Sequence, residues 1–294
     1  MTHKLWCEVC RCPFEAKRKD AKTCGDSCRL KLHYGKLRVK QQIVLSLFPG
    51  ADLLGRAFES MGFCVVRGPD VLWGGDVRSF HVPVGKFDGI IGGPPCQLFS
   101  SAALTGTRAE NLIPEFLRLI EEAKPQWAVM ENVKGVVDEK AGPAWPYTLV
   151  RDFDCGGLTN RIRAFWFYGI APVLEPTPRR GEVEHTVMAS SWKKRSTDNF
   201  PAHEYLKAED AERFQGFPGL GQSIMNAQPS FGAKSGLSAS SRNILAVHML
   251  GNGVPRAMGE YIARHVKRQV MQQDDWGRVD LPPYPLFMQP QVQG

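Results

Sequence analysis

The feature that most constrains the fold of this 294-residue sequence is an alternation of short apolar runs with amphipathic segments. Runs typical of buried strands cover residues 43–48, 63–66, 87–91, 126–130 and 164–168. Helical periodicity marks residues 53–61, 113–123 and 255–270. Strands that alternate with helices predict a mainly parallel α/β sheet, and such sheets bind ligands beyond the carboxyl ends of their strands. Gly50, Asp70, Cys96 and Glu131 all fall at or just after expected strand ends.

The alternation is lost over residues 170–250, which are rich in Pro, Gly, Ser and basic residues. We therefore expect five parts. They are a basic cysteine-rich module over 1–40, a main domain over 41–169, a small irregular region over 170–250, a helix returning to the main domain over 251–270, and an irregular tail over 271–294. Within the first part, residues 28–40 are expected to be helical.

Positive charge is concentrated at the amino end. Residues 1–40 hold 11 of the 37 Lys and Arg residues but only 4 of the 30 Asp and Glu residues, and the rest of the chain is balanced. Such a segment suits a polyanion, most simply nucleic acid, although a solvated basic tail fits the composition equally well. No apolar run is long enough to span a membrane, and no secretory signal core opens the chain, so we expect a cytoplasmic protein.

Five of the eight cysteines lie within residues 7–28, in two short hooks. Without a secretion signal, this clustering favours a structural Zn²⁺ ion over disulfides, with free thiols as the alternative. The expected ligands are Cys7, Cys10, Cys24 and Cys28. Cys12 is a spare thiol that either replaces a neighbouring ligand or stays free, and His3 and His33 are further candidates that fit surface histidines better than ligands.

Residues 92–97 read Gly-Gly-Pro-Pro-Cys-Gln directly after an apolar run. Two prolines restrict the backbone before Cys96, and two glycines allow other atoms to approach it. A thiol presented on such a turn is placed for nucleophilic attack, whereas a buried structural thiol needs no such presentation.

Two further groups of polar residues are compatible with a cleft beside that thiol. Glu131 ends a strand and is followed by Asn132; it is either a surface carboxylate or a buried carboxyl that donates a proton to a ring nitrogen. Arg161 and Arg163 precede the strand at 164–168 and are either solvated charges or ligands of a phosphate or carbonyl oxygen.

Seven segments, in this order, resemble the C5-cytosine DNA methyltransferase family. They are residues 46–50, 75–76, 92–97, 131–133, 161–163, 212–218 and 251–255. The resemblance extends over about residues 43–265 and implies a Rossmann-like fold that binds S-adenosylmethionine, with residues 170–250 as a small target-recognition region.

The resemblance also implies roles. Cys96 would add to C6 of cytosine, Glu131 would contact N3 and the exocyclic amine, Arg163 would bind O2, and Arg161 would support the site. The substrate would be double-stranded DNA with the target base flipped out, bound by a monomer, with residues 97–107 closing over the base. A bacterial or phage source is implied as well.

The cofactor pocket that the resemblance implies consists of Phe48, Gly50, Asp70, Asp76, Pro94, Leu112 and Asn252. The sequence departs from the family pattern at Ser46, where Asp is usual, at 51–52, where a Gly pair is usual, and at Thr159, where Gln is usual. The region for target recognition is also short.

Two other functions fit the same residues. The first keeps the chemistry and changes the substrate to RNA, because phosphate attraction is indifferent to sequence. The second is a catalytically idle DNA-binding protein on a methyltransferase scaffold. The joint presence of Cys96, Glu131 and Arg163 argues against the second.

Overall fold

The structure is a computed structural model that describes residues 2–7, 12–26, 28–29, 41–95, 110–184, 186–188, 206–226 and 239–271. It divides into two compact units, Met1–Gln41 and Gln42–Gly294. Several sequence predictions lie outside the described residues: Cys10, His33, residues 30–40 of the helix expected over 28–40, Cys96, the loop at 97–107 and residues 272–294 of the tail expected over 271–294.

The first unit contains an antiparallel hairpin of β1 (His3–Trp6) and β2 (Pro13–Ala16). Leu5 pairs with Phe14, and both are partly buried, whereas Lys4 and Trp6 are exposed. A two-stranded hairpin with so little apolar surface is marginal in water, so this unit needs another source of stability.

The second unit is built on a six-stranded sheet of order β4-β3-β5-β6-β8-β7. The strands in that order are β4 (Cys64–Arg67), β3 (Ile43–Leu47), β5 (Gly89–Gly92), β6 (Trp127–Asn132), β8 (Ile162–Tyr168) and β7 (Tyr147–Arg151). The first four run parallel, and β8 runs antiparallel to both of its neighbours. The reversed strand brings its amino end to the edge where β6 ends, because Ala164 pairs with Asn132.

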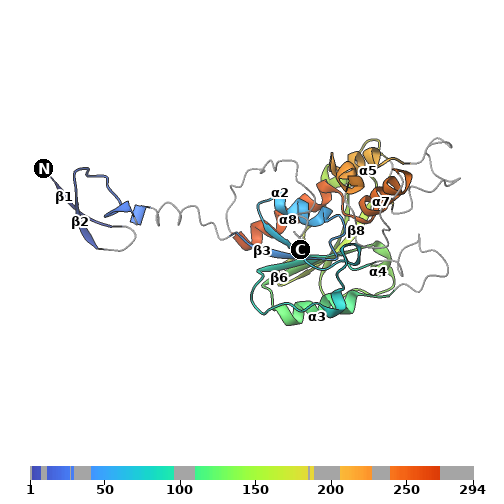
Figure 1. Ribbon diagram of the computed structural model, residues 1–294, viewed down its shortest axis with the longest axis horizontal. Helices are drawn as coiled ribbons and strands as arrows, with labels where there is room; N and C mark the ends of the chain where they lie inside the picture. Colours follow the sequence, from blue (N-terminus) through green and yellow to red (C-terminus); the bar gives the residue numbers. More distant parts are fainter. Residues whose placement is uncertain are drawn as a thin grey trace, which may run out of the picture. The chain divides into compact units, whose positions relative to one another are not determined.

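Helices cover both faces of this sheet. Figure 1 shows α2 (Leu53–Ser60) and α8 (Arg256–Met271) on one face and α3 (Ile113–Ala123) on the other. Alternation along the strands supplies both cores: Val44 packs with the α2 and α8 side, and Leu45 packs with the α3 side. The buried, continuous apolar strands are those expected of a sheet covered on both faces.

Short helices complete the connections. They are η1 (Val71–Trp73), η2 (Val77–Ser79), α4 (Lys134–Asp138) and η3 (Phe153–Cys155).

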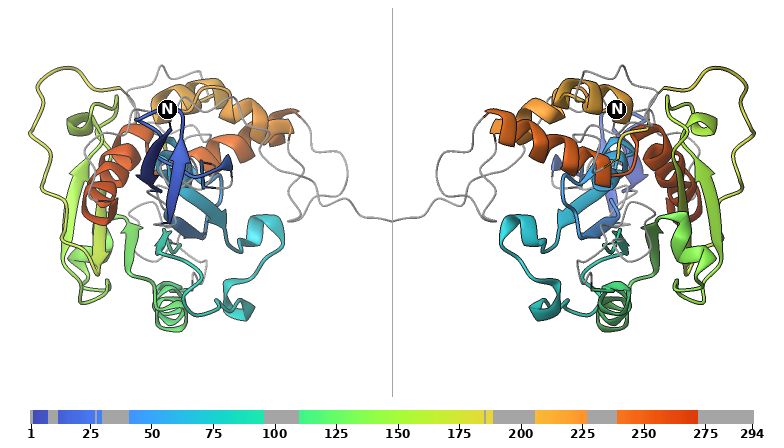
Figure 2. Two further views of the ribbon diagram at one scale, coloured as in Figure 1. Left: turned by 90° about the vertical axis from the view of Figure 1, so that its left-hand side faces the viewer. Right: turned by 90° about the vertical axis from the view of Figure 1, so that its right-hand side faces the viewer.

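Three more helices pack together at one end of the unit: α5 (Ala208–Gln215), α6 (Leu220–Asn226) and α7 (Ala239–Asn252) (Figure 2). Their core includes Phe214, Ile224 and Leu250. The expectation that residues 170–250 are irregular is therefore wrong for the parts that form α5, α6 and α7. The helices are short and separated by glycine- and serine-rich segments, so their periodicity was hidden in the average composition.

The strand bounds also differ from the expectation at the far edge of the sheet. β7 was not predicted, because its buried and exposed residues alternate and form no apolar run. β8 begins at Ile162 instead of residue 164, since its first residues pair with β7. The expected helix at 113–123 has the bounds of α3.

Candidate active site

The candidate active site lies where the chain changes direction across the sheet. β3 and β5 are neighbours, and Leu47 pairs with Gly92 at their carboxyl ends. The helices that follow them, α2 and α3, cover opposite faces (Figure 1). Open α/β sheets bind ligands at such a switch point, and the loops after β3, β5 and β6 all begin at this edge of the sheet.

The turn after β3 is tightly wound. Phe48, Gly50 and Asp52 all have left-handed backbone torsions, with φ of 55°, 54° and 54°. The space beside Gly50 is open, because a Cβ added there would meet no atom within 4 Å. Its N–H donates to Asp70 Oδ2 (2.8 Å), and its carbonyl accepts from Trp73 Nε1 (2.9 Å). The loop after β4 thus fixes the glycine turn.

Asp52 holds the same turn from inside. Its buried carboxylate accepts from Ser46 Oγ (2.7 Å) and from the N–H of Gly55 (3.2 Å), and its second oxygen pairs with Arg67 Nε (2.8 Å). Burial raises the pKa of Asp52 to about 6, against the opposing effect of Arg67. Ser46 and Asp52, two residues at which the sequence departs from the family pattern, are therefore joined by a hydrogen bond between their side chains.

Asp70 and Asp76, the two acids assigned to the cofactor pocket from sequence, both accept hydrogen bonds in this structure. Asp70 Oδ1 accepts from the N–H of Leu72 (2.9 Å) in addition to the bond from Gly50. Hydrogen bonds from Arg78 lower the pKa of Asp76 to about 2. Arg78 also reaches Glu110 (3.0 Å), two residues before Leu112, the partly buried N-cap residue of α3.

Glu131 and Arg163 form an ion pair at the carboxyl end of β6. Arg163 Nε lies 2.7 Å from Glu131 Oε1, and the two side chains are only 14% and 9% exposed. A Cβ added to Gly93 would lie 2.7 Å from Glu131 Oε2, so the glycine lets the carboxyl group approach the turn after β5. Burial raises the pKa of Glu131, while Arg163 and Arg161 oppose that rise.

Asn132 stabilises the turn that leads to Cys96. Its Nδ2 donates to the carbonyl of buried Pro94 (3.1 Å), and its Oδ1 accepts from the N–H of Val133 (2.9 Å). We did not assign it a role from sequence. The signal was its position, directly after Glu131 at a strand end.

Arg161 joins segments that are far apart in the sequence. Its guanidinium is buried and donates to the carbonyls of Val187 and Gly251, the latter at 2.6 Å. The next residue after Gly251 is Asn252, which is exposed and whose Nδ2 lies 3.2 Å from His248 Nε2. A Cβ added to Gly253 would meet Leu53, so the end of α7 lies against the start of α2.

Thr159 replaces the usual glutamine in the loop before β8. Its N–H and its Oγ1 donate to Asp152 Oδ2 at 3.0 and 2.7 Å. Burial raises the pKa of Asp152, which is fully buried. These hydrogen bonds fix the loop that directly precedes Arg161 and Arg163.

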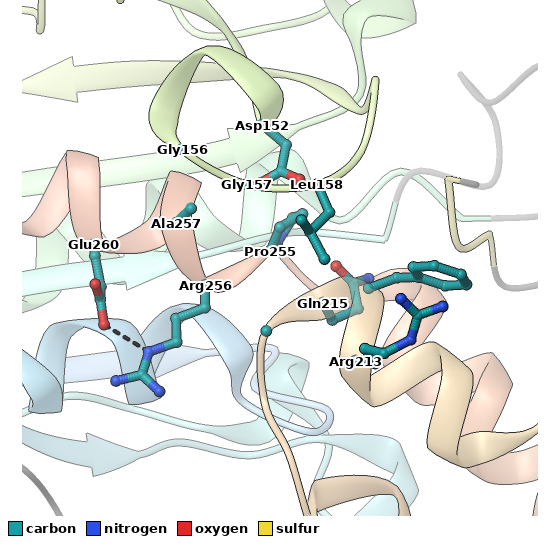
Figure 3. A pocket seen from close by; sticks show the side chains of 12 residues that line it. Asp152, Gly156, Gly157, Leu158, Arg213, Gln215, Pro255, Arg256, Ala257 and Glu260 are labelled. Atoms are coloured by element: carbon teal, nitrogen blue, oxygen red, sulfur yellow. Dashed lines mark hydrogen bonds and ion pairs between the residues drawn. The ribbon is translucent and has the colours of Figure 1, made fainter. Parts of the chain in front are cut away.

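A cavity of about 230 Å³ lies beside Asp152, which is one of its lining residues (Figure 3). It is lined by the loop at 156–158, the end of α5 and the start of α8, and Arg256 pairs with Glu260 at its rim (2.7 Å). None of the site residues predicted from sequence lines it.

In the first unit, the sulfur atoms of Cys7, Cys24 and Cys28 lie within 4.8 Å of one another. The sulfur atoms of Cys24 and Cys28 are 3.6 Å apart. Cys12 is exposed, and its carbonyl accepts from the N–H of Cys7 (3.0 Å). Among the described residues, no helix is both long and apolar enough to cross a membrane.

Comparison with known proteins identifies residues 74–170 as similar to the family C-5 cytosine-specific DNA methylase. The chain is 31% identical to the type II methyltransferase M.FnuDI of Fusobacterium nucleatum over 151 residues, which are 44% of this chain and 43% of that protein. It is 30% identical over 132 residues to the orphan methyltransferase M.SPRI of Bacillus phage SPR, covering 37% of this chain and 29% of that one. The matched part thus spans less than half the length of these relatives.

Among solved structures, the Entamoeba histolytica methyltransferase EhMeth superposes with a TM-score of 0.51 at 12% identity, over 78% of this chain and 99% of that one. The Rossmann-like α/β fold expected from sequence is confirmed.

Proposed function

Since this chain belongs to the C-5 cytosine-specific DNA methylase family through residues 74–170, we propose that it transfers a methyl group from S-adenosylmethionine to C5 of cytosine in DNA. The observation that carries the proposal is the buried pair of Glu131 and Arg163, set beside Gly93 and Pro94 on the turn that leads to Cys96.

Each member of this group has a chemical task. The thiolate of Cys96 forms a bond to C6, which moves the ring electron pair to C5. Glu131 pairs with Arg163 as a carboxylate here, and burial raises its pKa; in its protonated form it donates a hydrogen bond to N3 and stabilises the electron-rich ring. Arg163 binds O2. Loss of the C5 proton then expels the thiolate and restores the ring, which carries the new methyl group.

S-adenosylmethionine supplies an electrophilic methyl group. The open space beside Gly50 and the polar loop held by Asp70 fit a bulky polar ligand at the switch point. The residues proposed to hold it are Phe48, Gly50, Asp70, Asp76, Pro94, Leu112 and Asn252. Asp70 accepts two hydrogen bonds here and retains free lone pairs, since a carboxylate can accept about four, whereas Asp76 already receives four contacts from Arg78.

The proposed substrate is double-stranded DNA, bound by a monomer. A cytosine inside a duplex cannot reach a thiol at a sheet edge, so the base leaves the stack before reaction.

The test is a covalent trap. A duplex containing 5-fluorocytosine cannot lose a proton at C5, so with cofactor the wild-type chain should form a cross-link through Cys96. Cys96→Ser should abolish the cross-link and turnover with the fold intact, and Cys64→Ser, at an exposed cysteine, should change neither. Capture of an RNA containing the same analogue in place of the duplex would favour an RNA substrate. Tight DNA binding without transfer to any cytosine would favour an idle scaffold.

We also propose that the first unit binds one structural Zn²⁺ through Cys7, Cys24 and Cys28, with Cys10 as the fourth ligand. Three sulfurs so close together fit the Zn–S distances of about 2.3 Å in tetrahedral sites. A metal would also stabilise a hairpin that has little core of its own.

Elemental analysis of protein purified without chelator should give about one zinc per chain. Cys28→Ser should lower that content, whereas Cys64→Ser in the second unit should not. Less than half an equivalent in the wild type would contradict the zinc site.

A further inference from the structure

Asp52 stands at a position where most side chains would be strained. Its φ of 54° lies in the left-handed region, which Asp tolerates better than most residues because its short polar side chain bonds locally. The family pattern has Asp at residue 46 and a glycine pair at 51–52, whereas this chain has Ser46 and Asp52. Ser46 Oγ donates to Asp52 Oδ1 (2.7 Å), so a carboxyl group still lies against the end of β3, supplied from the other side of the turn.

The carboxylate of Asp52 joins β3 to two more elements. It caps α2 by accepting from the N–H of Gly55 (3.2 Å), and it pairs with Arg67 Nε of β4 (2.8 Å). An anion suits the amino end of a helix, because the helix dipole is positive there. Ser46 and Arg67 are partners in the register of β3 and β4, so an acid at residue 46 would lie beside Arg67 as well.

Gly55 leaves room for this carboxyl group. A Cβ added to Gly55 would clash with the carboxyl group of Asp52, so residue 55 has no space for a side chain while Asp52 occupies this place. Asp52 itself is only 3% exposed. The contact is therefore part of the packing at the first turn of α2, and it is not a surface pair that solvent can separate.

The turn that Asp52 holds carries residues proposed to bind the cofactor. Phe48 and Gly50 lie between Ser46 and Asp52, and both have left-handed torsions. The N–H of Asp52 donates to the carbonyl of Pro49 (2.5 Å), which closes the turn beside the open space at Gly50. Loss of the carboxylate would loosen this turn, because the contacts to β3, α2 and β4 would be lost together.

We propose that Asp52 is a positioning residue for the methyl donor. Its carboxylate fixes the turn at 48–52 in the shape that receives the cofactor, and it touches no reacting atom. The proposal rests on the proposed function for the identity of the ligand, S-adenosylmethionine. An acceptor kept at residue 52, or an acid returned to residue 46, is expected to restore the turn.

The test measures binding of S-adenosylhomocysteine, the demethylated cofactor, to the full chain by titration calorimetry. Asp52→Gly removes the carboxylate and still permits the left-handed torsion. Asp52→Asn keeps an acceptor for Ser46, and Ser46→Asp/Asp52→Gly moves the acid to residue 46. Thr148→Val is the matched control: Thr148 is also buried and donates to the carbonyl of Val173 (2.6 Å), but it lies on β7, at the other edge of the sheet from β4.

Asp52→Gly should weaken binding about tenfold, because hydrogen bonds to a charged group are lost from the turn. Asp52→Asn, the double variant and Thr148→Val should stay within about threefold of the wild type. Ser46→Ala, which removes a single contact, should weaken binding by a smaller factor, and it replaces Asp52→Gly if that chain does not fold. In a methyl transfer assay, Asp52→Gly should raise the KM for cofactor about as much as Kd and leave kcat nearly unchanged, whereas general loss of structure would lower kcat as well.

Wild-type affinity in Asp52→Gly would overturn the proposal, and so would an equal loss in Thr148→Val. Failure of both Asp52→Asn and the double variant to recover affinity would overturn it as well. A wild type that methylates cytosine with the same KM for cofactor as Asp52→Gly refutes the role of Asp52 alone. A set of variants whose cofactor affinities follow the expected order, in a chain that methylates no cytosine, refutes the proposed function alone.

Discussion

Replacing the carboxylate of Asp52 by an amide should stabilise the protein at neutral pH. The side chain is only 3% exposed, and burial raises its pKa from 3.8 to about 6 in the folded state. A carboxyl group with a raised folded pKa lowers stability once both states are ionised, above about pH 6, and that loss is relieved as the pH falls toward 4. The two pKa values differ by about 2, which corresponds to about 3 kcal/mol of unfolding free energy.

Asn tolerates the left-handed torsion of residue 52 and keeps an acceptor for Ser46 and Gly55. Arg67 keeps its ion pair with Glu59 (3.0 Å). Asp52→Asn should therefore be about 3 kcal/mol more stable than the wild type at pH 8, with the difference fading by about pH 4.

Urea unfolding from pH 4 to pH 8 measures this difference. Asp76→Asn is the control with the opposite sign, because Arg78 lowers the pKa of Asp76 to about 2, so this variant should lose stability at neutral pH. An Asp52→Asn protein that is less stable at pH 8, or a difference that does not change with pH, would refute the reasoning.

Three further predictions concern packing and metal. Gly93→Ala should leave the thermal midpoint nearly unchanged but reduce methyl transfer, because the new Cβ displaces the flexible Glu131 carboxyl group; unchanged turnover would contradict this role. Gly89→Ala should destabilise the fold by about 3 kcal/mol in urea unfolding, since its Cβ would lie 2.1 Å from the buried ring of Trp127, and a loss below about 1 kcal/mol would show that the core can adjust. Removal of zinc by a chelator should unfold the first unit, as followed by the accessibility of Cys28 to a thiol reagent, and leave cofactor binding by the second unit intact.

The central strands were predictable from sequence because they are buried on both faces. Runs such as residues 43–48 and 126–130 are apolar except for Ser46 and Gln126, and such a run indicates a buried strand. β7 escaped prediction because its buried residues, Thr148 and Val150, alternate with less buried ones, so the segment contains no continuous apolar run. The helices α5 to α7 escaped for a different reason, since segments rich in glycine and serine lie between them.

The site was predictable where its residues are consecutive with strand ends, as Glu131 is. The hydrogen bonds that join the site residues to one another and to distant segments could not be predicted. Nothing in the local sequence shows that Asp52 adopts a left-handed torsion and returns its carboxylate to Ser46, because that contact depends on the turn between them. Arg161 was expected to support the site, and its buried bonds to Val187 and Gly251 join segments far apart in the chain.

The antiparallel orientation of β8 has a consequence for the order in which the candidate site forms during synthesis. Glu131 leaves the ribosome with the parallel strands, but its arginine partner arrives only after the β7 segment and the bend at Asp152. Until that last strand docks, the glutamate lacks its arginine partner, and the proposed base-binding site is incomplete. A nascent or truncated chain that ends before Ile162 should therefore be unable to form the trapped adduct, even with its thiol already made.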